Sequence, residues 1–94
     1  MDPAPNLPYR LKPHLLLQRV ADETVVLDPD SGRYYTLDEV ATRMIELFTS
    51  VSLEETLATM VEEYDTDVDT VRADLEALLE SMAEEGLVER DPEG

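Results

Sequence analysis

The hydrophobic pattern of this chain changes its period once, just before residue 40, and this change most constrains the fold. Before it, short apolar runs are separated by turn residues, which is typical of strands. After it, apolar residues recur every three or four positions, which is typical of amphipathic helices. The order therefore predicts an α+β fold, in which a small antiparallel sheet precedes three helices and shares one core with them.

Three strands are expected in the first part of the chain. Apolar runs at 15–20 and 24–27 are separated by Ala21-Asp22-Glu23, which predicts a hairpin with a three-residue connection. Asp28-Pro29-Asp30-Ser31-Gly32 combines a fixed φ, short polar side chains and a glycine free to take positive φ, so it predicts a turn. Arg33-Tyr34-Tyr35-Thr36 follows as an aromatic and β-branched strand. These elements predict a three-stranded antiparallel meander.

Three capping signals predict where the helices begin. They are Thr36 with Glu39, Ser52 with Glu55, and Asp67. Gly86 is expected to end the third helix, because glycine takes the left-handed conformation that follows many helices. Leu87 and Val88 are then expected to fold back onto the core.

The length and the terminal segments define the expected domain. A chain of 94 residues predicts one domain, since single domains usually run to about 100–200 residues. Residues 1–12 are rich in proline, so a flexible arm is expected there. Residues 13–88 are expected to form the domain and 89–94 a flexible tail. No signal peptide and no membrane-length apolar run is visible, so the cytoplasm is the expected location.

The charge is strongly acidic and unevenly distributed. The net charge of −16 comes from 23 acids against 7 bases, and residues 53–94 hold 15 of the acids and 2 of the bases. This field repels phosphate backbones and attracts cationic partners. The third helix of a DNA-binding winged helix is usually basic, and here it is acidic. No nucleic-acid or membrane partner is therefore expected.

The segment from Asp28 to Glu39 partly matches a calcium-binding loop. Asp28, Asp30 and Glu39 fit positions 1, 3 and 12 of an EF-hand loop. Position 5 is Gly32, which has no side-chain oxygen, and position 6 is Arg33, where the loop needs glycine. A turn leading into a strand explains the segment better, so no metal site is expected.

The residue types for catalysis are scarce. The chain has no cysteine, only one histidine (His14) and three glycines, so it offers no metal–thiolate site, nucleophile pair or phosphate loop. Asp30-Ser31 resembles the attachment site of a carrier protein, but that serine should begin a helix, whereas Ser31 lies between two expected strands. No catalytic residue, no enzyme activity and no cofactor are expected.

The third expected strand is a candidate edge for binding a peptide. Residues 33–36 carry one charge and two tyrosines, so little protects this edge against pairing with another strand. A peptide can add to such an edge through backbone hydrogen bonds. Because strand residues alternate between faces, Tyr34 and Tyr35 cannot both lie in the core, and one is expected to face solvent or a ligand.

The sequence DPDSGRYYTLDEVATRMIELF, together with the order of the two helical segments after it, resembles the PqqD-like family of RiPP precursor peptide recognition elements. The resemblance covers about residues 13–88, and residues 7–11 resemble stand-alone members found with lasso-peptide clusters. The family often has Asn at the position of Asp38 and smaller residues near Val40 or Thr42. These departures concern the helix cap and its packing.

The resemblance implies a reduced winged-helix shape with a binding cleft between the third strand and the third helix. The leader of a ribosomal precursor peptide is implied to pair there as an added strand, and to be presented to a leader peptidase and a cyclase. The implied peptide-binding residues are Arg33, Tyr34, Tyr35, Thr36, Val71, Asp74, Leu75, Leu78 and Met82. A lysine-containing leader is expected to meet Asp74 and Glu85.

Two alternatives stay open at this point. One is an acidic regulatory module that binds the basic face of another protein, which the charge alone would also favour. The other is an enzyme, against which the scarcity of catalytic residue types argues.

Overall fold

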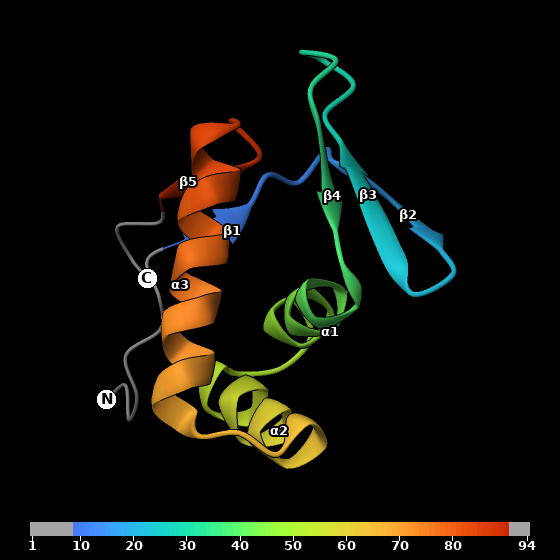
Figure 1. The fold of residues 1–94 in the computed structure, drawn as a ribbon. Helices are drawn as coiled ribbons and strands as arrows, with labels where there is room; N and C mark the ends of the chain where they lie inside the picture. The colour runs from blue at the N-terminus through green and yellow to red at the C-terminus, as the bar shows by residue number, and fades with distance from the viewer. Residues whose placement is uncertain (1–8, 91–94) are drawn as a thin grey trace.

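The computed structural model describes residues 9–90, and its elements follow the expected order. Residues 1–8 of the expected arm (1–12) and residues 91–94 of the expected tail (89–94) lie outside the described residues. The elements are β1 (Tyr9–Leu11), β2 (Leu16–Val20), β3 (Glu23–Leu27), β4 (Tyr34–Leu37), α1 (Glu39–Phe48), α2 (Leu53–Tyr64), α3 (Val68–Glu84) and β5 (Val88–Arg90). Figure 1 shows β2, β3 and β4 on one side, α3 on the other, and α1 and α2 at the base between them.

The expected three-stranded antiparallel sheet is confirmed, with the order β2-β3-β4. The connection between β2 and β3 is shorter than expected. Glu23 pairs with Val20 inside the ladder, so only two residues form the loop. Ala21, the first of them, has a φ of 57°. Its left-handed conformation closes the hairpin tightly, and this backbone choice was not visible from the residue types.

The expected turn between β3 and β4 is confirmed. The Gly32 N–H donates to the Asp28 carbonyl at 2.8 Å, and the Asp28 N–H donates to the Arg33 carbonyl at 2.9 Å. The Asp28 side chain accepts a bond from the Asp30 N–H at 2.9 Å. Gly32 has a φ of 77°, which side chains other than glycine adopt only at a cost. The turn delivers β4 to the edge of the sheet.

Two of the three expected helix caps are confirmed, and the first is wrong. Ser52 caps α2 and Asp67 caps α3, each accepting a backbone N–H three residues on. The cap of α1 is Asp38, whose Oδ1 accepts from the Ala41 N–H at 2.8 Å. Thr36 cannot cap this helix because it lies inside β4.

The core lies where the sheet and the three helices meet. Val26 and Leu37 enter it from the sheet, and the helices contribute Met44, Ile45, Leu53, Leu57, Met60, Val71, Leu75, Leu79 and Met82. Gly86, with a φ of 80°, ends α3 as expected and turns the chain back. Leu87 and Val88 then return to the core, and both are buried.

A second sheet joins the two ends of the described chain, and it was not expected. β1 pairs antiparallel with β5, with Tyr9 opposite Arg90 and Leu11 opposite Val88. Residues 9–11 therefore do not belong to an arm, nor residues 89–90 to a tail. The strands form because Tyr9 and Leu11 pack against the core while their backbones bond to β5. None of the described helices is long and apolar enough to cross a membrane.

Candidate functional site

The outer edge of β4 is unpaired within the described part of the chain and lies on the side of the sheet nearest α3 (Figure 1). The bond from the Asp28 N–H to the Arg33 carbonyl fixes the alternation of the β3–β4 ladder. In an antiparallel pair only every second residue exchanges backbone bonds with its partner. Tyr35 and Leu37 therefore bond to β3, whereas the N–H and C=O groups of Tyr34 and Thr36 point outward, away from β3.

The side chains of β4 divide between the core and the surface. Tyr34 is 66% exposed, whereas Tyr35 is half-buried and packs against the core. The expectation that only one of the two tyrosines faces outward is thus confirmed. Thr36 and Arg33 are also exposed. Three of the four strand residues expected at the site are therefore accessible to a ligand.

The five α3 residues expected at the site do not all reach its surface. Val71, Leu75 and Met82 are at most 2% exposed and belong to the core. These three side chains hold α3 against the core, but they are not accessible to a ligand. Asp74 is exposed and Leu78 is half-buried, and both line a hollow beside the sheet.

That hollow lies between α1 and α3 and has a volume of about 360 Å³. It is lined by Asp38, Val40, Ala41, Met44, Asp74, Ala77, Leu78 and Ser81. Ala77 and Ser81 were not expected at the site. They follow Asp74 at helical spacings of three and seven, so all lie on one face of α3. Their small side chains leave room for another chain to approach.

A second hollow of about 260 Å³ lies toward the other end of α3. It is formed by the β3–β4 turn and residues 83–86, with Lys12 beside them. Across it, Nη1 of Arg33 lies 3.4 Å from Oε1 of Glu85, and both side chains are about half exposed. The two hollows are thus arranged along α3. Asp38, which follows β4, lines the first, and Arg33, which precedes β4, lines the second. We call the two hollows together the cleft, from Asp74 to Glu85.

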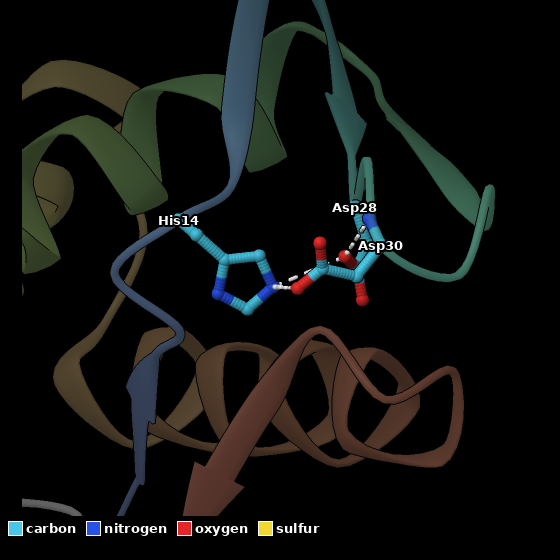
Figure 2. A group of neighbouring side chains, drawn as sticks. All are labelled: His14, Asp28 and Asp30. Carbon is cyan, nitrogen blue, oxygen red and sulfur yellow. Dashed lines mark hydrogen bonds and ion pairs between the residues drawn. The ribbon is translucent and has the colours of Figure 1, made fainter.

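His14 lies beside the β3–β4 turn, although no partner for it was expected. Its Nε2 is 3.1 Å from Oδ1 of Asp28 and 3.4 Å from Oδ2 of Asp30, and Figure 2 shows the ring directed at both carboxylates. Burial alone would raise the pKa of Asp28, but hydrogen bonds from the Asp30 backbone, Ser31 and His14 outweigh it and hold this pKa below its usual value.

The same three side chains are the group of described residues best placed for a cation. Their ligand atoms lie within 4.8 Å of one another. Oδ1 of Asp28 is already occupied by bonds from the Asp30 backbone and the His14 ring. These bonds account for the closeness of the three side chains, because they hold the segment before β2 against the β3–β4 turn.

Comparison with known proteins identifies the family to which this fold belongs. The family model of coenzyme PQQ synthesis protein D (PqqD) matches residues 23–88. The structure is also similar to that of "TbiB1 in Complex with the TbiA(beta) Leader Peptide", with a TM-score of 0.76 and 30% sequence identity. That match covers 85% of this chain and 94% of the other. No curated protein matches. Since the family model spans most of the chain, including β3, β4 and all three helices, the chain belongs to the PqqD family.

Proposed function

We propose that this chain binds the leader segment of a ribosomally made precursor peptide as an added strand along β4. The observation that carries the proposal is the outward-directed backbone of Tyr34 and Thr36, on a strand whose two flanking residues, Arg33 and Asp38, line the hollows of the cleft. The similarity to TbiB1, solved in complex with a leader peptide, supports it. Strand addition satisfies the exposed backbone groups of β4 and gives affinity through main-chain bonds.

The dimensions of the cleft suit a short strand. β4 spans four residues, or about 13 Å at about 3.3 Å per residue. Along α3 the distance from Asp74 to Glu85 is about 16 Å, at about 1.5 Å per residue. A leader segment of about four to five residues would therefore occupy the cleft from end to end.

Side-chain recognition would come mainly from the hollow between α1 and α3. Val40, Met44 and Leu78 supply its apolar surface. Successive residues of an added strand point to opposite sides, so every second leader residue would face α3. Fully burying one large apolar side chain there would contribute about 1.5–3 kcal/mol. We therefore expect an apolar anchor in the leader, positioned opposite Leu78.

Charges at the two ends of the cleft would set register and rate more than affinity. Asp74 is exposed and has no ion pair within the described chain, so it is free to meet a leader lysine. Glu85 is already paired with Arg33, so a lysine there would have to compete. Exposed pairs contribute only about 0–1 kcal/mol each. The net charge of −16 would still accelerate the encounter with a cationic leader.

A leader held along β4 would leave the rest of the precursor free. We propose that the chain presents this precursor to a leader peptidase and a cyclase, as in lasso-peptide pathways. The rival function is an acidic module that binds any basic protein segment. The two differ in sequence dependence, because a strand in a cleft needs its anchor in register whereas a charged surface does not.

Calorimetric titration with a synthetic leader, taken from a precursor peptide identified among the neighbouring reading frames, tests the proposal. Leu78→Ala should weaken binding by about 5–30-fold, because about 1–2 kcal/mol of apolar contact is lost at a half-buried site. Leu16→Ala is the matched control, since Leu16 is 56% exposed on β2, far from α3. Equal leader affinities of Leu78→Ala and Leu16→Ala would refute binding in the cleft. Equal affinity for a scrambled leader of the same composition would favour the acidic module.

A further inference from the structure

A second groove lies between α2 and α3 and has a volume of about 540 Å³, larger than either hollow of the cleft. Leu53 and Leu57 form its floor and are 5% exposed. Val68, at the start of α3, forms part of its rim and is 49% exposed. The groove is therefore an apolar surface that the described part of the chain leaves open.

Arg72, on the rim of this groove, is exceptional among the arginines. Five arginine side chains are described, and the other four each hold an ion pair with a glutamate. Arg72 is partly buried and holds no hydrogen bond or ion pair within the described residues. In a chain with 23 acids, a guanidinium without a carboxylate is unexpected, and its five donors remain available to a partner.

The groove and the cleft use different faces of α3. Val68 and Arg72 are four residues apart and share one face, as expected for helical spacing. Asp74, Leu78 and Ser81 lie on another, with the buried stripe of Val71 and Leu75 between them. No residue lines both, so the chain could hold ligands at the groove and the cleft together.

We propose that the groove is the docking site for an amphipathic helix of a protein partner, and that a carboxylate of this helix pairs with Arg72. The apolar part of α2 that lines it runs from Leu53 to Val61, which is about two turns or ~12 Å. A partner helix would cover this length with apolar residues at positions i, i+3 or i+4, and i+7. Charge complementarity requires Asp or Glu beside that stripe, because Arg72 is the cation at the rim.

The partner is one of the enzymes that act on the precursor, and this assignment rests on the proposed function. A presenting protein must contact its enzyme without releasing the leader, and the groove leaves the cleft free. Docking through the groove would bring the bound precursor to the enzyme as a single complex. Docking would raise the effective concentration of the precursor at the enzyme, without adding any contact to the precursor itself.

Binding measurements with a purified leader peptidase and cyclase, identified among the neighbouring reading frames, test the inference. Arg72→Glu and Val68→Asp should each weaken binding to one of these enzymes at least tenfold. Val68→Asp should fold, because Val68 is the first residue of α3 and an acidic side chain in the first turn of a helix is stabilising. Arg72→Lys, which keeps the charge, should stay within about threefold of the parent chain. The leader affinity of all three variants should not change.

Three results would overturn the inference. The first is that neither enzyme binds the parent chain, and the second is that both charge variants bind as the parent does. The third is a dimer of the parent chain in sedimentation that Arg72→Glu dissociates, since the groove would then take a second copy. A parent chain that binds the enzyme but not the leader would instead refute the proposed function and leave the groove assigned.

Discussion

Replacing Thr36 by proline separates strand addition from every other way of binding in the cleft. The Thr36 N–H points away from β3, so the ladder that holds β4 does not use it. The side chain is exposed, and edge strands tolerate proline where the missing N–H would face solvent. Thr36→Pro should therefore fold, with less than about 1 kcal/mol lost in the free energy of unfolding.

The same substitution should disrupt leader binding. The lost hydrogen bond contributes about 0.5–1.5 kcal/mol, and the leader carbonyl left without a donor adds about 1–3 kcal/mol. Because the cleft is partly open to water, we take the lower part of this range. About 2 kcal/mol corresponds to an affinity about 30-fold weaker, at about 1.4 kcal/mol per factor of ten.

Calorimetric titration of the leader into Thr36→Pro and Thr36→Ala provides the comparison, with thermal melting of both to confirm folding. Thr36→Ala keeps the N–H and should bind within about threefold of the parent chain. Leader peptides with single N-methylated residues give a second measurement on the unaltered chain. Methylation should weaken binding only at alternate leader positions. Equal affinity of the two variants, or no alternation along the leader, would refute strand addition.

Three further predictions concern stability. Gly32→Ala should lower the free energy of unfolding by about 1 kcal/mol, which corresponds to about 4–8 °C in melting temperature. The cause is the backbone, because a φ of 77° disfavours any side chain, whereas no atom lies within 4 Å of the position of the added Cβ. An unchanged melting temperature would contradict this prediction. Asp28→Asn should be less stable than the parent at pH 7. Because folding lowers the pKa of Asp28, the stability difference between the parent and Asp28→Asn should shrink as the pH falls below about 3.8. Denaturant titrations at pH 7 and pH 2.5 measure this difference. The same difference at both pH values would refute the stabilising role of the Asp28 carboxylate. A double-mutant cycle on Arg43 and Glu63, which share two bonds of 2.9 and 2.7 Å at 37% exposure, should give a coupling of only about 0.3–1 kcal/mol. Salt at 1 M should reduce that coupling, and a value that salt leaves unchanged would contradict a solvent-exposed pair.

Local residue chemistry explains why most of the fold could be predicted from the sequence. The turn at residues 28–32, the cap at Ser52 and the stop at Gly86 each depend on a few adjacent residues. The first helix shows the limit of such signals. Thr36 with Glu39 and Asp38 with Ala41 offer competing caps, and the pairing of Thr36 with Val25 in the sheet decides between them.

The cleft was harder to predict because the strongest hydrophobic stripe of a helix marks its core face. That stripe contains Val71, Leu75 and Met82, which the structure buries. The face that lines the cleft carries Ala77 and Ser81 instead, and small residues beside an acid give no periodic signal. For β4 the alternation of two tyrosines showed that one would face outward, but only the ladder shows which backbone groups do so.

The pairing of β1 with β5 has a consequence for how the protein is made. Among the described elements β1 is synthesised first and β5 last, so every other described element is made before β1 can pair with its partner. Contacts this distant in sequence form late, because closing the loop between them costs entropy that local contacts do not. The strand pair also bonds to the segment that leads to β2, through the Lys12 N–H and the Leu87 carbonyl. During translation the end of the cleft beside Lys12 would therefore be completed only after α3 has emerged, and a nascent chain would not hold a leader along its full length.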